Sequence, residues 1–294
     1  MQWSIGFCNA DIRQVIKEKK SQLSFKWLPL ANSSCSIADP FIFKDVDGKL
    51  NLLYEDFSMT NPTNYGKIVL SVIDKDFSIT STKKVLDIKS HSSYPFIFTE
   101  NGSTYIIPET SSVKKVSIFE YNFNTQSLTN EKVLLNNLPL LDSTIFKYNS
   151  KYWLFATLAE NGFDHSHLHI YYSDSLSGNY QPHKNNPVKI NLDGSRPAGN
   201  IIVIDNEIYR PAQNCSIHYG ESISINRVTQ LSENEFEEEF YFKLFPDKSS
   251  GFNSGVHTLN VVDDVIVIDG IKMLFKPWLK WKLFLQKKIK NTSH

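Results

Sequence analysis

ADPFIFKDVDGKLNLLYED (residues 38–56) is the stretch of sequence that decides the fold. It consists of an apolar segment, an Asp47-Gly48 pair, and a second segment rich in apolar and aromatic residues. Asp-Gly pairs adopt the positive φ angles of a tight hairpin turn, so the stretch predicts a β-hairpin. The same arrangement recurs in SYPFIFTENGSTYIIPET (93–110), LDSTIFKYNSKYWLFATL (141–158), RPAGNIIVIDNEIYRPAQ (196–213) and VHTLNVVDDVIVIDG (256–270).

The repeat has the size of a propeller blade. Its turns, at Asp47, Asn101, Asn149, Asp205 and Asp263, follow one another at intervals of 48 to 58 residues. A blade needs four short strands, which a period of about 50 residues accommodates. The outer strands are expected in KIVLSVI (67–73), VSIFEYNF (116–123), HLHIYYS (167–173) and SISINRVTQL (222–231). We therefore predict an all-β, five-bladed β-propeller over residues 1–270, with helices only at 11–20 and at the C-terminus.

Composition narrows the partners of the chain. The 31 Lys and Arg residues balance the 31 Asp and Glu residues, so no overall field points to nucleic acid. The three cysteines, Cys8, Cys35 and Cys215, fit neither a disulfide framework nor a zinc-ligand spacing. Because the sequence has no Gly-rich phosphate loop, CxxC pair or nucleophile elbow, we predict neither a cofactor nor a metal. It shows no secretion signal or membrane span, so a cytoplasmic location is expected.

The start of each repeat carries a chemically distinctive residue. In a propeller the innermost strands run beside the central channel, so matched positions of different blades converge on one mouth. Four of the five residues at these positions can carry charge, where packing would need only apolar side chains. These five residues together predict a binding or catalytic site at the channel mouth. The alternative is that they are ordinary loop residues exposed to solvent. The five residues are Asp39, Tyr94, Asp142, Arg196 and His257.

The far ends of the hairpins add further polar residues. They are Glu55, Asp56, Glu109, Arg210, Gln213 and Asn214. An arginine and a carboxylate buried among strands need each other, so Glu109 and Arg210 either belong to the site or form a structural ion pair. The alternating His165, His167 and His169 would share one face of a strand. That spacing suits zinc, but an exposed strand edge is commoner.

Several segments resemble a known superfamily of sugar enzymes. ADPFIF (38–43) and LLDSTIF (140–146) resemble the strands that carry two catalytic aspartates in five-bladed glycosidases and fructosyltransferases. HIYYSDSLSGNYQPHKNNPV (169–188) resembles an outer-strand signature of the same group. The resemblance implies catalytic roles for Asp39 and Asp142.

A closer resemblance covers nearly the whole chain. Residues 183–239 are similar to the N-terminal domain of plant glucosamine inositolphosphorylceramide transferases and its bacterial relatives, which belong to surface-polysaccharide loci. The marks are RPAG (196–199), YRPAQ (209–213), Cys215, Tyr219-Gly220 and HTLN (257–260). Together with the repeat positions, the resemblance predicts that Asp39, Asp142 and Glu109 are catalytic. It also gives substrate-binding Glu55, Tyr94, Arg196, Asn200, Arg210, Gln213, Tyr219 and His257.

One departure from the hydrolases shapes the expected function. They place an acidic Glu at the start of the fourth blade, where this chain has Ser195-Arg196-Pro197. Arginine cannot donate its proton at working pH, but its planar fork suits a phosphate leaving group. We therefore expect a glycosyltransferase-like enzyme of bacterial surface polysaccharide (capsule or O-antigen) biosynthesis, which transfers sugar from a phosphate-activated donor to a glycan acceptor. Two alternatives remain: a glycosidase with Asp39 as base and Glu109 as acid, and a non-catalytic glycan-binding propeller.

The C-terminal segment 271–294 differs from the rest of the chain. Between Lys272 and Lys290 it carries seven lysines and no acidic residue, interleaved with Trp, Leu and Phe. A polybasic amphipathic pattern of this kind predicts a short helix lying on anionic lipid, here at the inner membrane. The alternative is a helix packed on the propeller with its lysines in solvent.

Overall fold

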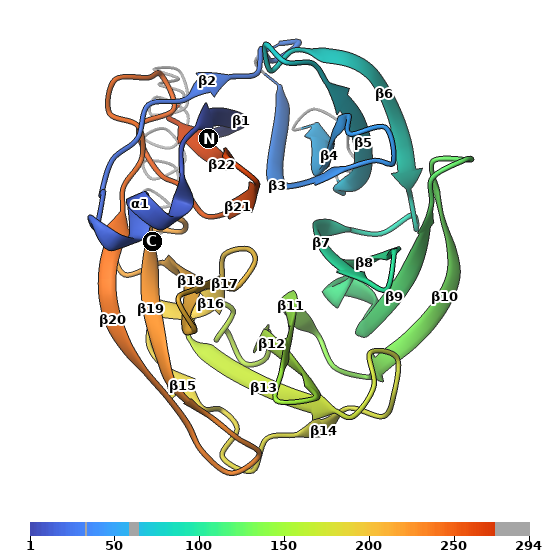
Figure 1. The fold of residues 1–294 in the computed structure, drawn as a ribbon, viewed down its shortest axis with the longest axis vertical. Coiled ribbons are helices and arrows are strands. Elements are labelled where there is room, and N and C mark those ends of the chain that lie inside the picture. Colours follow the sequence, from blue (N-terminus) through green and yellow to red (C-terminus); the bar gives the residue numbers. More distant parts are fainter. Residues whose placement is uncertain (33, 59–64, 274–294) are drawn as a thin grey trace, which may run out of the picture.

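The computed structural model describes residues 1–32, 34–58 and 65–273. Five antiparallel sheets stand around a central axis as the blades of a ring (Figure 1). The first hairpin of each repeat is innermost (Figure 1), and its strands are buried on both faces, as β3 is from Ser36 to Phe43. The predicted all-β, five-bladed β-propeller is confirmed.

Blades 1 to 4 are each built from one continuous segment, with strands following in order from the axis outward. Blade 1 holds β3 (Cys35–Lys44), β4 (Leu50–Ser58), β5 (Lys67–Ile73) and β6 (Ile79–Leu86). Blade 2 holds β7 (Ser93–Glu100), β8 (Ser103–Glu109), β9 (Lys115–Asn122) and β10 (Ser127–Asn136), with the 3₁₀ turn η1 (Ser111–Val113) between β8 and β9.

Blades 3 and 4 each carry one additional short strand. Blade 3 holds β11 (Leu140–Tyr148), β12 (Lys151–Leu158), β13 (His167–Ser173) and β14 (Gln181–Pro182), and β15 (Lys189–Ile190) also pairs with β13. In blade 4, β16 (Asp193–Pro197) and β17 (Ile202–Ile204) share the edge of β18 (Glu207–Asn214), followed by β19 (Ser222–Leu231) and β20 (Phe236–Leu244). The four predicted outer strands correspond to β5, β9, β13 and β19.

Blade 5 closes the ring with strands from both ends of the described chain. β21 (Leu259–Val262) and β22 (Val265–Lys272) continue outward into β1 (Gln2–Asn9) and β2 (Lys26–Trp27). β1 and β22 pair from Gln2 opposite Lys272 to Asn9 opposite Val265, and they lie side by side in Figure 1. β22 therefore extends two residues beyond the predicted propeller boundary at 270.

Helices are few in the part of the chain that the structure describes. The helix expected at 11–20 is α1 (Ile12–Lys17), and the Asp11 side chain caps it by accepting the Arg13 N–H at 2.8 Å. No helix within the described ranges is long and apolar enough to cross a membrane. Of the amphipathic C-terminal segment expected at 271–294, Ile271 and Lys272 belong to β22, and residues 274–294 lie outside the described residues.

The inner hairpins of blades 1, 2 and 3 each contain a β-bulge at the same place. The bulge interrupts the regular alternation of side chains between the two faces of the strand. The register of each inner hairpin shifts at this place, between Ala38 and Phe41 in blade 1 and at the matched places in blades 2 and 3. Inside each bulge a non-glycine residue has positive φ: Asp39 (51°), Tyr94 (39°) and Asp142 (53°). Bulges re-aim side chains and often lie beside functional sites, so the backbone itself presents these three positions to the axis.

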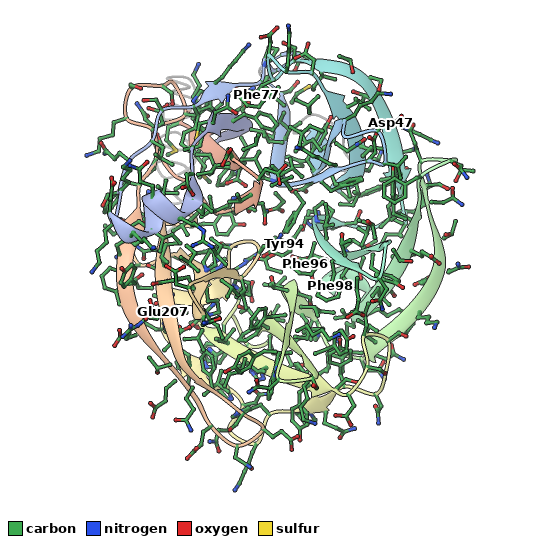
Figure 2. The ribbon with its side chains drawn as sticks, in the orientation of Figure 1. Asp47, Phe77, Tyr94, Phe96, Phe98 and Glu207 are labelled. Carbon is green, nitrogen blue, oxygen red and sulfur yellow. The ribbon has the colours of Figure 1, made fainter. Side chains whose placement is uncertain are left out.

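Tyr94 lies near the axis and joins three blades (Figure 2). Its ring packs edge-on against Phe41, with centroids 4.8 Å apart. Its hydroxyl is 2.9 Å from Thr144 Oγ1 in blade 3 and accepts the Gly199 N–H of blade 4 at 2.6 Å. Gly199, with φ +120°, runs so close to blade 5 that a Cβ there would lie 1.9 Å from the Leu259 carbonyl oxygen. Buried Tyr94 of blade 2 thus connects its own blade to blades 1, 3 and 4 near the axis.

Candidate active site at the channel mouth

One pocket of about 400 Å³ receives residues from all five blades. Its polar and aromatic lining consists of Trp3, Asp39, Glu55, Phe57, His91, Ser93, Glu109, Ser111, Asp164, His165, Arg196, Tyr219 and His257. The structure thus brings together six predicted site residues: Asp39, Glu55, Glu109, Arg196, Tyr219 and His257. A larger pocket of about 610 Å³ lies between blades 2 and 3, but none of the predicted site residues lines it. The mouth pocket is therefore the candidate site.

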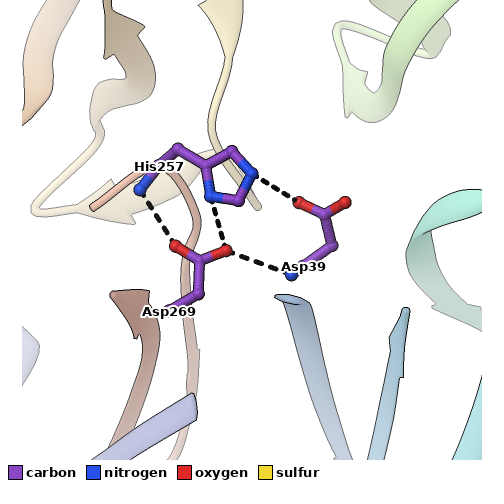
Figure 3. A group of neighbouring side chains, drawn as sticks. All are labelled: Asp39, His257 and Asp269. Atoms are coloured by element: carbon purple, nitrogen blue, oxygen red, sulfur yellow. Dashed lines mark hydrogen bonds and ion pairs between the residues drawn. The ribbon is translucent and has the colours of Figure 1, made fainter. Parts of the chain in front are cut away.

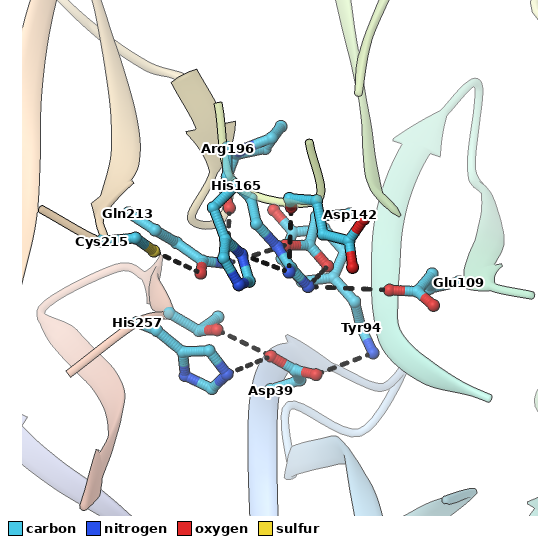
Figure 4. Close-up of polar contacts among 12 residues, drawn as sticks. Asp39, Tyr94, Glu109, Asp142, His165, Arg196, Gln213, Cys215 and His257 are labelled. Atoms are coloured by element: carbon cyan, nitrogen blue, oxygen red, sulfur yellow. Dashed lines mark hydrogen bonds and ion pairs between the residues drawn. The ribbon is translucent and has the colours of Figure 1, made fainter. Parts of the chain in front are cut away.

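The arginine side of this pocket, formed by Asp142, Arg196 and Gln213, is a closed ion pair (Figure 4). Arg196 Nε donates to Asp142 Oδ2 at 2.6 Å, and Arg196 Nη2 donates to Oδ1 at 3.3 Å. Gln213 Nε2 donates to Asp142 Oδ2 at 2.7 Å. Asp142 and Gln213 are 1% and 0% exposed, beneath Arg196. The structure therefore places Asp142, predicted to be catalytic, as the counter-ion of Arg196, and Gln213 as its support rather than as a pocket wall.

The remaining donors of Arg196 also have protein partners. Nη1 donates to the Asp164 carbonyl at 3.3 Å and lies 3.2 Å from His165 Nδ1, while Nη2 lies 4.0 Å from Glu109 Oε2. The guanidinium carbon lies 5.2 Å from the centre of the Tyr219 ring. The sequence suggested that the Arg196 guanidinium binds a phosphate group. In the structure, the contacts with these protein groups already occupy that guanidinium.

The histidine side of the pocket, formed by Asp39, His257 and Asp269, is a chain of three buried groups (Figure 3). Asp269 Oδ2 lies 2.6 Å from His257 Nδ1, and His257 Nε2 lies 3.4 Å from Asp39 Oδ1. The Thr258 hydroxyl donates to Asp39 Oδ1 at 2.9 Å, and the Tyr94 N–H donates to Oδ2 at 3.2 Å. The nitrogen and oxygen atoms of these three side chains that could coordinate a metal ion lie within 4.8 Å of one another. Their direct contacts with one another account for this proximity. Unlike Asp142, Asp39 lines the pocket.

Burial gives the pocket carboxyl groups unusual acidities. Burial raises the pKa of Asp39 to about 6, against the opposing effect of His257. Burial and the neighbouring Asp142 raise the pKa of Glu109 to about 8, although Arg196 acts in the opposite direction. Burial, followed by repulsion from Asp39, raises the pKa of Glu55 well above its ordinary value. At neutral pH, Asp39 is therefore mostly ionised and Glu109 mostly protonated.

Aromatic rings form one wall of the pocket. The Trp3 ring stacks on His257, with centroids 4.0 Å apart, and Tyr219 meets His257 edge-on at 5.1 Å. Trp3 belongs to β1, so the N-terminal strand of blade 5 contributes to the site. Flat rings beside carboxylates suit a sugar, whose apolar face stacks while its hydroxyls hydrogen-bond.

Three residues predicted to bind substrate lie elsewhere. Tyr94 is fully buried near the axis, as described above. Arg210 is 1% exposed and pairs with Glu238 of the same blade through Nε and Nη2 at 2.7 and 2.6 Å, so it forms a structural ion pair, but neither with Glu109 nor between blades as the alternative had it. Asn200 lies between β16 and β17, where its N–H donates to Asn260 Oδ1 at 2.8 Å. None of the three lines the pocket.

The sequence analysis missed several residues in and around the pocket, among them Trp3, His91, Thr258 and Asp269. Trp3, His91 and Thr258 come from β1 and from the segments before β7 and β21. Asp269 ends the fifth hairpin just as Glu55 and Glu109 end the first two, so the repeat itself contained that signal.

The three alternating histidines do not act together. His165 lines the pocket, whereas His167 contacts Ser166 and stacks near Phe163. Over the described ranges, His165, His167 and His169 do not belong to any group of converging metal ligands.

Solved structures share this architecture. One is a GH43 β-1,3-galactosidase with galactodeoxynojirimycin, which is 11% identical with a TM-score of 0.56 and covers 76% of this chain and 83% of that chain. Another is a family 117 glycoside hydrolase from the marine bacterium Zobellia galactanivorans, 10% identical with a TM-score of 0.56, covering 96% of this chain and 98% of that chain. At such low identity the likeness concerns the fold alone.

Sequence comparison is more specific. Residues 28–259 match the family described as glucosamine inositolphosphorylceramide transferase 1, N-terminal. Glucosamine inositolphosphorylceramide transferase 1 of Arabidopsis thaliana is 33% identical over 210 residues, which is 69% of this chain and 26% of that protein. The protein of the same name from Oryza sativa subsp. japonica is 29% identical over 258 residues, 80% of this chain and 34% of that protein. The chain thus spans about a third or less of the length of these relatives. It belongs to the glucosamine inositolphosphorylceramide transferase 1 N-terminal family.

Proposed function

We propose that the mouth pocket catalyses glycosyl transfer, with Glu109 as the general acid and Asp39 as the general base. One observation carries the proposal: of the carboxyl groups that line the pocket, buried Glu109 has a pKa of about 8 and buried Asp39 a pKa of about 6, while Asp142, beneath the pocket, is paired with Arg196. Surroundings that push two carboxyl pKa values apart suit an acid and a base acting at one bond near neutral pH.

The proposed chemistry balances its protons. Glu109 gives a proton to the oxygen that leaves the anomeric carbon, and Asp39 takes a proton from the attacking hydroxyl group. The bond to the leaving oxygen breaks and a bond to the attacking oxygen forms. An acceptor sugar in the attacking position yields a new glycoside, whereas water yields hydrolysis.

The contacts of Arg196 favour a donor different from the one that the sequence suggested. A phosphate held by this guanidinium would have to displace its bidentate pairing with Asp142, which is buried. A protonated Glu109 is useful to a leaving group that needs a proton, such as another sugar. We therefore favour a glycoside donor over a phosphate-activated one.

The relatives support transfer, because they are named transferases. Since the chain spans about a third or less of their length, we carry over neither their substrate nor their acceptor. A role in bacterial surface polysaccharide biosynthesis and a cytoplasmic location remain predictions. Hydrolysis is the second candidate, because the same acid and base can activate water.

A donor panel tests the proposal. The protein is incubated with labelled oligosaccharides, nucleotide sugars and phospho-sugars, with and without a glycan acceptor, and products are identified by mass spectrometry. We expect a new glycoside from an oligosaccharide donor, formed only with acceptor. Glu109→Gln should abolish it, whereas Glu207→Gln, at the exposed start of β18 in blade 4, should not.

Other outcomes of the panel replace the proposal. Free sugar formed without acceptor indicates a glycosidase. Acceptor-dependent release of nucleotide or phosphate restores the phosphate-activated donor and a clamping role for Arg196. Glycan binding without any turnover indicates a binding module.

We further propose that the tail holds the protein on anionic lipid. Each lysine near such a surface contributes about 1 kcal/mol of attraction, and salt screens it. Truncation after Met273 keeps β22 whole, whereas truncation at 270 would remove buried Ile271 from the β1 ladder. The 1–273 protein should keep the melting temperature of the full chain but no longer sediment with anionic vesicles at low salt. Insolubility of this variant would instead favour a tail packed on the propeller.

A further inference from the structure

We propose that Asp269 and His257 form a positioning dyad that fixes the carboxylate of Asp39 and maintains it in its ionised form. The inference deepens the proposed function, in which Asp39 is the base. The contacts that support it, however, exist whether or not the pocket turns over a sugar.

Asp269 holds both strands of the seam between blades 5 and 1. Its side chain is 0% exposed. Oδ1 accepts the N–H groups of His257 at 2.9 Å and Thr258 at 3.0 Å, and Oδ2 accepts the Asp39 N–H at 3.0 Å. Oδ2 also lies 2.6 Å from His257 Nδ1. One buried carboxylate therefore fixes the backbone of both Asp39 and His257 by hydrogen bonds, and it lies at ion-pair distance from the His257 ring, whose Nδ1 makes no aligned hydrogen bond within the described ranges.

The ring of His257 is held so that its two nitrogens face two carboxylates. Trp3 stacks on it at 4.0 Å and Tyr219 meets its edge at 5.1 Å. Nδ1 faces Asp269, and Nε2 lies 3.4 Å from Asp39 Oδ1. Burial lowers the pKa of His257, but the carboxylates of Asp269 and Asp39 outweigh that effect and raise it. An imidazolium in this position places a positive charge beside Asp39.

Most of the other titratable groups around Asp39 are acidic, so a positive charge on His257 is needed to favour the ionised form of Asp39. Titratable groups surround it from each neighbouring element: Glu55 of blade 1, Tyr94 and Glu109 of blade 2, Asp142 of blade 3, Arg196 and Tyr219 of blade 4, and Asp269 and His257 of blade 5. Arg196 is already paired with Asp142. Within the described ranges, His257 is the side chain in direct contact with Asp39 that can carry a positive charge.

Two substitutions test the dyad, with a matched control. His257→Gln keeps a donor but removes the charge, Asp269→Asn keeps an acceptor oxygen, and His169→Gln changes a histidine of β13 that does not line the pocket. The Asp39 carboxyl is titrated by infrared spectroscopy on protein with ¹³C-labelled aspartate, and Asp39→Asn assigns the band. We expect the Asp39 midpoint to rise by about one pH unit in His257→Gln, less in Asp269→Asn, and not at all in His169→Gln.

The same shift of the Asp39 midpoint should appear in the kinetics, as a change in the acidic limb of the pH dependence of kcat/KM. In His257→Gln, kcat/KM at pH 6 should fall by up to about tenfold and recover as the pH is raised. An unchanged Asp39 midpoint in a folded His257→Gln overturns the dyad. A shifted midpoint without any glycosyl transfer keeps the dyad and removes the proposed function, so the two can fail separately.

A measurement on the unaltered protein guards against variants that fail to fold. The ¹⁵N shifts of His257, assigned by selective labelling, report its protonation directly. Both nitrogens should be protonated at pH 7. A neutral His257 at that pH overturns the proposal without any substitution.

Discussion

The arginine side and the histidine side of the pocket begin from the same backbone feature and reach different chemistry. Asp142 and Asp39 occupy the same bulge in blades 3 and 1, both with positive φ. Asp142 meets an arginine, whose charge is permanent, and is sealed beneath it. Asp39 meets a histidine, whose charge depends on its surroundings, and stays at the pocket. The partner, rather than the position in the repeat, decides which aspartate is available for chemistry.

The largest expected difference between the two sides is in activity. Asp39→Asn should lower kcat/KM by about 10²- to 10⁴-fold, the usual contribution of a general base, with a melting temperature within a few degrees of the original. Steady-state kinetics and thermal melts on the same preparations check this. If Asp142→Asn loses as much activity without losing stability, the two sides are equivalent and the comparison fails.

Stability should show the reverse order. Arg196→Leu leaves the Asp142 carboxylate buried without its charge partner, which should cost about 3–5 kcal/mol in denaturant unfolding. Adding Asp142→Leu should recover most of that loss, because no unpaired charge then remains. His257→Gln on the other side should cost clearly less. A small loss of unfolding free energy in Arg196→Leu would show that Asp142 is not buried away from solvent on the arginine side.

Glu109, which lies between the two sides, predicts a pH-dependent stability. Its pKa is about 8 in the folded protein against an ordinary 4.5, so the folded state binds the proton more tightly. Stability should therefore fall as the pH rises from about 4.5 through 8, by an amount on the order of a few kcal/mol. Glu109→Gln should flatten this fall in urea titrations at pH 5 to 9. An equally steep fall in the variant would place its cause elsewhere.

The smallest effects come from single hydrogen bonds. Gln213→Leu and Thr258→Val each remove one donor, from Asp142 and Asp39 respectively, at a cost of about 1–2 kcal/mol each. Of the two, Thr258→Val should also move the acidic limb of kcat/KM upward, by less than one pH unit. A similar shift in Gln213→Leu would mean that the arginine side of the pocket also contributes to this limb.

Local signals predicted most of the fold. Turn pairs such as Asn101-Gly102 marked the hairpins, because their backbone angles are a property of two adjacent residues. The outer half of blade 5 could not be found in this way. β1 completes that blade by pairing with β22, about as far apart as the described chain allows, and nothing in the repeat specifies such a partner.

The site was predictable in position but less so in role. Repeat alignment brought Asp39, Arg196 and His257 to the mouth, because matched starts converge. It could not show that the long Tyr94 side chain reaches across the channel, or that Arg196 turns onto Asp142. Both depend on side-chain direction after the bulge, and a linear pattern does not record that.

The pairing of β1 with β22 sets the order in which the molecule can assemble. Asp142 and Arg196 are 54 residues apart, so they can meet while the chain is still being synthesised. Asp39 and Asp269 are 230 residues apart and can meet only when almost all of the described chain has left the ribosome. A nascent or clipped chain without its fifth blade therefore carries a base that lacks its three blade 5 partners, His257, Thr258 and Asp269. Catalytic competence would then report that the ring has closed, and would separate finished molecules from unfinished ones.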